Sequence, residues 1–115
     1  MLLAEGDRLL IAHRRLFDKD DSRFFVGKVL AYDSGLVKVE GHSFVRDVIS
    51  GRVLEKVESR IKVFSLTSGT LIVYQLPASV CLDSFQLVPN EGRLLAKDKT
   101  GFSMNLSDHA HSGRL

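Results

Sequence analysis

Cysteine and long apolar segments are both scarce in this chain, and each shortage excludes a class of protein. The 115 residues include one cysteine, so an intramolecular disulfide framework, a metal ribbon and a CxxC redox motif are excluded. The apolar runs are far shorter than the ~20 residues that a membrane-spanning helix requires. No basic-then-apolar leader opens the chain, so the sequence predicts a cytoplasmic protein without a membrane partner.

A strong excess of one charge is also missing. The 16 basic and 14 acidic side chains leave a formal net charge of +2, too small an excess to indicate nucleic-acid binding from bulk charge alone. Catalytic signatures are absent as well: there is no Gly-rich phosphate loop, no GxSxG sequence and no HExxH pair. We therefore expect a protein that is not an enzyme and carries no cofactor or metal.

The composition is that of an ordinary globular domain. Hydrophobic residues make up 44% of the chain and charged residues 26%, which is unlike a disordered segment. A chain of this length buries roughly two-thirds of its surface on folding. That burial is enough for one modest core.

Strand signals dominate the first half of the chain. Residues 8–13 are predicted as a strand, and a helix over residues 2–16 is the alternative, less favoured because apolar positions do not recur three and four apart. Residues 24–32 form the longest apolar stretch, and Gly27 in its middle predicts a bulge or a sharp bend. Residues 36–40 alternate cleanly between apolar and charged side chains, as in a half-buried strand.

Glycine turns separate these segments. A ribbon is predicted from residues 44–49 and 52–57, and a tight hairpin from residues 61–66 and 70–76. Gly35 is expected to adopt a positive φ in its turn. The three predicted connections are Asp33-Ser34-Gly35, Ser50-Gly51 and Thr67-Ser68-Gly69.

The strand over residues 70–76 is apolar on both faces, because Leu71 and Val73 oppose Ile72 and Tyr74. Such a strand is covered on two sides. In a domain of this size the second cover is often another copy of the protein. We therefore predict a homo-oligomer with Ile72 and Tyr74 in its interface.

The C-terminal part is less regular. Pro77 ends the preceding strand. Residues 79–85 fit either one helical turn, with Ser79 as N-cap, or an irregular strand. Residues 88–95 resemble a short hairpin.

We expect residues 1–96 to form one small β domain and residues 97–115 to form a polar, flexible tail. Five to seven short strands with glycine turns about ten residues apart favour a small, strongly bent all-β barrel. The chain is short for a full sandwich.

Two segments resemble the Sm-like fold. Residues 26–33, Val-Gly-Lys-Val-Leu-Ala-Tyr-Asp, resemble the first motif of that family, and residues 63–74, with Gly69 in the turn, resemble the second. The resemblance covers about residues 24–76, roughly half of the chain. SH3-like and Tudor-like barrels share much of this pattern, and residues 6–10 followed by residues 25–29 suit them equally well. The resemblance implies a small barrel and a ring of subunits joined through strand edges.

The base-binding residues of the Sm-like family are not matched. The place of the family's asparagine is occupied by Val37, and the place of its arginine by Ser68. An aliphatic side chain does not hydrogen-bond a base edge, and serine does not stack on a base as a guanidinium does. The resemblance therefore does not imply the family's uridine site.

A basic cluster is the best candidate for ligand binding. His13, Arg14 and Arg15 are consecutive, with Arg23 and Lys28 nearby in sequence, and guanidinium groups bind phosphates in bidentate fashion. The alternative is a solvated patch neutralised by neighbouring aspartates. The predicted ligand-binding set joins two of these arginines to two turns: Arg14, Arg15, Asp33, Ser34, Gly35, Ser68 and Gly69.

Other constellations are interpreted as structural. Asp18, Asp20 and Asp21 suggest calcium, but Arg23 and Val29 stand where an EF-hand loop needs glycine and a carboxylate. The tail sequence Asp-His-Ala-His at 108–111 lacks a third fixed metal ligand. Cys81 is interpreted as a small buried hydrophobe. The strand aromatics are interpreted as core or interface rather than stacking platforms: Phe24, Phe25, Tyr32, Phe44 and Tyr74.

Two functions remain open from the sequence. The first is a self-associating binding module for RNA or another anionic ligand, whose affinity would fall steeply with salt. The second is a structural or adaptor protein that contacts another protein through a strand edge or an apolar patch.

Overall fold

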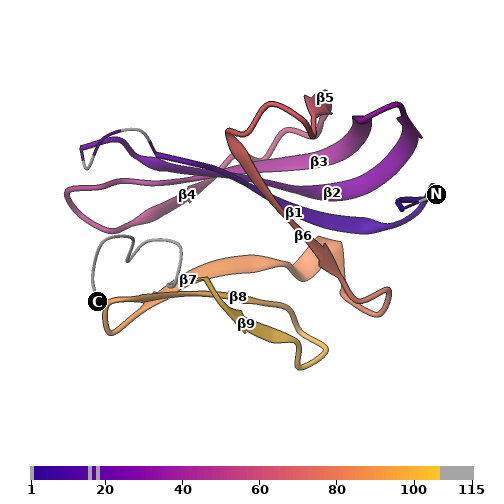
Figure 1. The fold of residues 1–115 in the computed structure, drawn as a ribbon. Coiled ribbons are helices and arrows are strands. Elements are labelled where there is room, and N and C mark those ends of the chain that lie inside the picture. Colours follow the sequence, from indigo (N-terminus) through magenta and orange to yellow (C-terminus); the bar gives the residue numbers. More distant parts are fainter. Residues whose placement is uncertain (1, 16, 18, 107–115) are drawn as a thin grey trace. The chain divides into compact units, whose positions relative to one another are not determined.

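The computed structural model describes residues 2–15, 17 and 19–106, and this part of the chain is all-β, as predicted (Figure 1). Its one helical element is a 3-10 turn, η1 (Leu82–Ser84), and the described part holds no helix of the length and apolarity that a membrane span needs. The chain divides after Ala78 into two compact units. The strands of the first unit are β1 (Arg8–His13), β2 (Ser22–Asp33), β3 (Leu36–Arg46), β4 (Val53–Glu55), β5 (Arg60–Ser65) and β6 (Leu71–Leu76).

All six strands of the first unit belong to one antiparallel sheet. Strand β2 lies between β1 and β3, and β6 pairs with the other side of β1. Strand β3 is long enough to pair with β5 through its first half and with β4 through its second half. The strand over residues 8–13 is therefore confirmed over the helical alternative, and so is the polar ribbon.

The predicted tight hairpin between β5 and β6 is wrong. Strand β5 pairs with β3 and β6 pairs with β1, so the segment between them passes from one edge of the sheet to the other. The amide of Leu66 donates to the carbonyl of Gly35 (2.8 Å), and the amide of Arg14 donates to the carbonyl of Thr70 (2.8 Å). These bonds to other loops hold the connection in its crossing path. Among the described residues the sheet is not closed into a barrel.

The core of the first unit follows the period-two pattern of its strands. Its buried residues share one face of the sheet, and both Val37 and Val39, predicted to face one side, belong to it. Phe25 and Phe64 pack with ring centroids 5.4 Å apart. The core cluster is Leu3, Leu9, Ile11, Phe25, Val29, Val37, Val39 and Phe64.

The hairpin connection predicted at Asp33-Ser34-Gly35 is present, with the turn shortened to two residues because Asp33 belongs to β2. Ser34 has φ 51° and Gly35 has φ 83°, and the flanking Asp33 and Leu36 are paired. Two consecutive positive φ angles match the right-handed twist of the strands. The expectation for Gly35 is confirmed.

Gly27 lets strands β2 and β3 approach closely and does not lie at a bulge. The register shift in β2 falls between Val29 and Ala31, while Gly27 stands directly opposite Gly41. A Cβ on Gly27 would lie 2.9 Å from the Cα of Gly41, and one on Gly41 would lie 2.6 Å from the Cα of Gly27. At this point the two backbones leave no room for a side chain on either strand.

The second unit is a separate three-stranded antiparallel sheet with the order β7, β8, β9. The predicted hairpin over residues 88–95 is confirmed, with Glu91 at φ 51° and Gly92 at φ 80° in its turn. The helical turn η1 follows Cys81, so Ser79 is not its N-cap. The strands are β7 (Gln86–Asn90), β8 (Arg93–Lys97) and β9 (Ser103–Asn105).

Strand β9 lies beyond the boundary at residue 96 that the sequence suggested. It pairs with β8, and the amide of the buried Leu106 donates to the carbonyl of Leu94 (2.8 Å). Phe102, Met104 and Leu106 alternate with small or polar residues, a period-two signal for this strand that the sequence interpretation passed over because the surrounding residues are polar. Residues 107–115, which include the tail histidines, lie outside the described residues.

Candidate functional site

At one end of the first sheet, the side chains on the core face change from apolar to polar. In β1 the buried Ile11 is followed two residues later by His13, and in β2 Arg23 precedes Phe25 by the same interval. Strand β3 places Ser43 directly opposite Phe25, on the same face. The strand register thus brings polar groups from three strands to one end of the core.

Strand β5 adds cations to the same face. Lys62 stands opposite the buried Val39, so it and Arg60, two residues away, face the core side. The apolar residues between and after them, Ile61 and Val63, point the other way and are 59% and 60% exposed. The polarity of this strand is therefore inverted, with charge on the core face and apolar side chains on the outer face.

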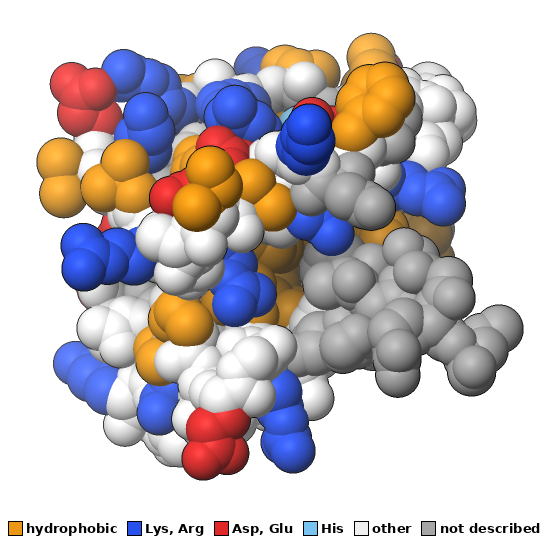
Figure 2. Space-filling model, turned by 90° about the vertical axis from the view of Figure 1, so that its left-hand side faces the viewer, with side chains coloured by type: hydrophobic (Ala, Val, Ile, Leu, Met, Phe, Trp, Pro, Cys, Tyr) orange, Lys and Arg blue, Asp and Glu red, His pale blue; other side chains and the backbone are white. Residues whose placement is uncertain are grey.

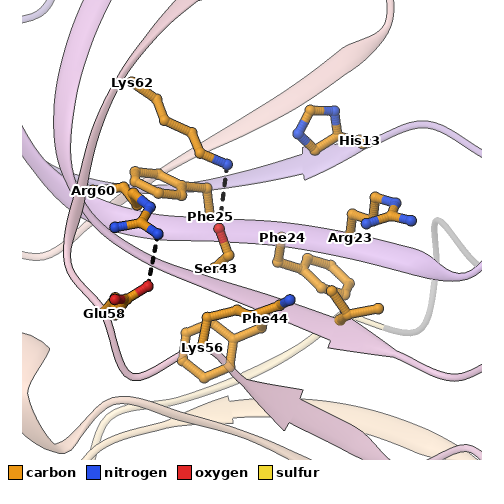
Figure 3. Close-up of a pocket in the computed structure, with 11 residues that line it drawn as sticks. His13, Arg23, Phe24, Phe25, Ser43, Phe44, Lys56, Glu58, Arg60 and Lys62 are labelled. Atoms are coloured by element: carbon orange, nitrogen blue, oxygen red, sulfur yellow. Dashed lines mark hydrogen bonds and ion pairs between the residues drawn. The ribbon is translucent and has the colours of Figure 1, made fainter.

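These groups surround a pocket of about 340 Å³ (Figure 3). Four lysine or arginine side chains and one carboxylate line it, together with three phenylalanines. Every lining residue belongs to the first unit. The lining residues are His13, Arg23, Phe24, Phe25, Ser43, Phe44, Val45, Lys56, Glu58, Arg60 and Lys62.

Lys62 lines the pocket beside Phe25 and Ser43. Its Nζ lies 5.0 Å from the centroid of the Phe25 ring and donates to Oγ of Ser43 (3.3 Å), as Figure 3 shows. An ammonium over an aromatic face is attracted by the ring quadrupole. Both contacts of this ammonium are therefore with neutral groups.

The Glu58 carboxylate, which lines the pocket, forms an ion pair with Arg60. Glu58 Oε1 accepts from Nη2 of Arg60 at 2.6 Å, and the two side chains are 71% and 58% exposed. An exposed ion pair of this kind contributes little to stability. It neutralises Arg60 only in part, and it leaves Arg23, Lys56 and Lys62 without a carboxylate among the described lining residues.

His13 experiences the positive potential of the pocket. Partial burial, and then the charges of Lys62 and Arg23, lower the pKa of His13 below its ordinary value of 6.5. Its ring packs against Phe64 with centroids 6.2 Å apart. At neutral pH the imidazole is neutral and can donate one hydrogen bond to an anion in the pocket.

Comparison with protein-family models, with curated proteins and with solved structures found no match to this chain.

The end of the molecule that carries the β1–β2 loop faces the viewer in Figure 2. Lysine and arginine side chains are prominent on the part of this face formed by the six-stranded sheet, and exposed hydrophobic side chains lie among them. The loop and the turn after β3 are joined here, because the amide of Val48 donates to Oδ1 of Asp21 (3.0 Å). The exposed Phe17 and Ile49 belong to these two segments. The surface near the pocket is thus basic and partly apolar.

The arginines predicted as ligand contacts bind backbone carbonyls. Nη1 of Arg14 donates to the carbonyl of Gly69 (3.3 Å), and Nη1 of Arg15 donates to the carbonyl of Asp20 (3.4 Å). Neither arginine lines the pocket, although their neighbour His13 does. Both side chains are exposed.

The two predicted ligand-binding turns lie against each other. A Cβ on Gly35 would be 3.3 Å from Cγ2 of Thr67, next to the bond between Leu66 and Gly35 described above. Ser34 Oγ donates to Oδ1 of Asp33 (3.0 Å), and Ser68 Oγ accepts from the amide of Thr70 (3.3 Å). The structure brings the turns together and ties Gly69 to Arg14, but it places none of this set on the pocket lining.

The remaining candidates have local roles. The carboxylate of Asp20 accepts from the amide of Phe17 (3.1 Å), and that of Asp21 accepts from Val48, so each caps a loop amide. Asp18 and residues 108–111 lie outside the described residues. Cys81 is half-buried in the second unit, and its amide donates to Oδ2 of Asp98 (2.7 Å).

The sequence interpretation missed most of the pocket cations. Lys56, Arg60 and Lys62 come from the segment that was interpreted as ribbon and hairpin. The signal was present in the alternation over residues 60–64, where charged side chains share the period of the buried Phe64 and apolar ones do not.

Proposed function

We propose that this chain is a non-enzymatic binding module whose ligand is an anion, such as RNA, that enters the basic pocket. One observation carries the proposal: strand register and a loop bring Arg23, Lys56, Arg60 and Lys62 around one cavity, to which the described residues contribute a single carboxylate. Like charges held close together repel one another. A ligand with phosphate groups would relieve this repulsion through charge-assisted hydrogen bonds.

The experiment measures binding of a fluorescein-labelled oligoribonucleotide by anisotropy over a series of salt concentrations. The double variant Arg23→Gln/Lys62→Gln is compared with Lys28→Gln/Lys38→Gln, which removes two exposed cations from the same sheet outside the pocket lining. We expect the pocket variant to bind more weakly, with a slope of log affinity against log salt reduced by about 1.4 for two lost phosphate contacts. The control variant should bind like the wild type. Equal effects of the two variants would reject the pocket as the site.

We also propose that the first unit is a small barrel of SH3-like or Sm-like type. The order of its strands supports this, because β6 returns to pair with β1 after a crossing connection from β5. A sheet that bends until its two edge strands approach each other is the geometry of a partly open barrel.

Self-association, and with it an adaptor role, is the second candidate. Strands β5 and β6 each pair with one strand among the described residues, so the sheet has two open edges, and β5 exposes Ile61 and Val63. Pairing β5 of one copy with β6 of the next is a heterologous contact, which forms a ring when the rotation between copies closes. Light scattering on an eluting peak tests it: a mass of about five to seven chains supports the ring, and 12.8 kDa rejects it.

A further inference from the structure

The basic pocket combines cations with an aromatic ring that the free protein keeps covered. Phe25 is 1% exposed although it lines the pocket, and the Lys62 ammonium lies over its ring. The ring is held in place from the core side by Phe64. Phe25 is therefore a fixed aromatic platform beneath a side chain with several rotatable bonds.

An anion that enters the pocket would offer the Lys62 ammonium a stronger interaction than its present partners do. Its two partners, the Phe25 ring and the Ser43 hydroxyl, are neutral, and the Glu58 carboxylate is engaged with Arg60. A phosphate carries a charge opposite to that of the ammonium, so its hydrogen bond with Lys62 is stronger than a contact with the uncharged ring or hydroxyl. Movement of the ammonium to the phosphate uncovers the face of the ring.

We propose that the pocket binds one nucleotide unit: the phosphate forms an ion pair with the Lys62 ammonium, and the base stacks on the face of the Phe25 ring that the ammonium covers in the free protein. This inference rests on the proposed anion-binding function and names its ligand class. The volume of about 340 Å³ lies at the lower end of small-ligand sites, roughly 300–1,000 Å³. The unit comes either from an RNA strand or from a free nucleotide, which present the same chemistry.

The arrangement of the other cations favours a strand over a free nucleotide. Arg23 lies beside His13 on one side of Phe25, and Arg60 lies on the other side (Figure 3). Phosphates that flank the bound unit in a strand therefore meet guanidinium groups in both directions. A mononucleotide engages fewer of these groups, so we expect it to bind more weakly.

The test uses four probes with the wild-type chain: an oligoribonucleotide containing 2-aminopurine, an abasic strand of equal length, a nucleoside monophosphate and polyglutamate. We expect the base-containing strand to bind about tenfold more tightly than the abasic strand, with quenching of the 2-aminopurine fluorescence by stacking. Tighter binding of the monophosphate than of the strand assigns the pocket to a free nucleotide. Tighter binding of polyglutamate than of either nucleic acid overturns the inference in favour of an acidic protein partner.

The variant Phe25→Leu separates stacking from charge, because it removes the ring and keeps an apolar side chain. We expect it to lose the preference for the base-containing strand and to keep the affinity for the abasic strand. Phe85→Leu is the matched control, since it removes a buried ring of the second unit that does not line the pocket. Equal losses in the two variants overturn the role of Phe25, with thermal melts reporting whether each variant is folded.

These outcomes distinguish a failure of the nucleotide inference from a failure of the proposed anion-binding function. If both strands bind equally and their affinity falls in Arg23→Gln/Lys62→Gln, the anion site stands and the nucleotide inference fails. If no probe binds, the proposed function fails with it. The fluorescence quench in the wild type tests stacking even where a Phe25 variant does not fold.

Discussion

His13 is held where protonation is unfavourable. Burial, Lys62 and Arg23 lower its pKa below 6.5, and the uncharged Phe64 ring is its aromatic neighbour. The unfolded chain therefore takes up this proton at a higher pH than the folded chain, so the free energy of unfolding decreases as the pH falls below about 6.5. We expect His13→Gln to lose less stability than the wild type between about pH 7 and pH 5, as measured by urea denaturation. Equal losses would contradict the prediction.

The same residue makes ligand binding depend on pH with the opposite sign. A bound phosphate stabilises the imidazolium and raises the pKa of His13 in the complex. Affinity for an oligoribonucleotide should therefore increase as the pH falls from about 7.5 to about 5.5. The difference between the wild type and His13→Gln in this pH range measures the contribution of His13.

Gly27 and Gly41, which stand opposite each other where β2 pairs with β3, should tolerate no side chain. Gly41→Ala places a methyl group where the Cα of Gly27 lies 2.6 Å away, so the strands have to separate. We expect the free energy of unfolding to fall by about 1–3 kcal/mol, measured by chemical denaturation. Lys38→Ala, at an exposed position of the same strand, is the control. An effect no larger than that of the control would contradict the prediction and show that the two strands can separate at little cost in free energy.

At the scale of elements, the β2–β3 turn holds a strained residue. Ser34 adopts φ 51°, which asparagine tolerates better than serine, and Asn-Gly is a favoured pair for this turn. Ser34→Asn should raise the free energy of unfolding by about 0.5 kcal/mol. Ser59→Asn, in an exposed segment without a positive φ, should change it little. Thermal melts of the two variants check the prediction, and a lower melting temperature for Ser34→Asn contradicts it.

The strands and short turns were predictable from sequence because their signals are local. Alternation over residues 36–40 and the Ser34-Gly35 pair depend only on neighbouring residues, and both predictions are confirmed. The β5–β6 hairpin was predicted on equally good local grounds and is wrong. The competing pairings, β5 with β3 and β6 with β1, join segments far apart in the chain, and a single sequence carries no direct signal for them.

The candidate site was only partly predictable for the same reason. His13 and Arg23 were recognised as members of a basic cluster by their closeness in sequence. Lys62 reaches the pocket only because β5 pairs with the first half of β3. Lys56 reaches it only because it lies in the connection between β4 and β5, which both pair with β3. The pocket depends on strand register, whereas the sequence prediction depended on sequence distance.

At the scale of the whole molecule, the two open edges of the first sheet decide whether the chain acts alone. Ile72 and Tyr74 are on β6, half-buried in the described chain, and on the face opposite Leu71 and Val73, which pack against the core. If the ring forms, Ile72→Lys and Tyr74→Lys should lower the molar mass measured by light scattering towards that of one chain. Circular dichroism controls for folding. Folded variants that keep the mass of the wild type would remove these residues from the interface.

The Gly27–Gly41 pair also has a consequence for the order in which the chain folds. A slip of one residue between β2 and β3 would bring Val26 or Lys28 opposite Gly41, where the backbones leave no space. Only one alignment of this hairpin therefore closes fully, and its two-residue turn allows closure in about 1–10 μs. We expect β2 and β3 to align first and correctly. Strands β1, β5 and β6 then pair with a hairpin whose register is already set.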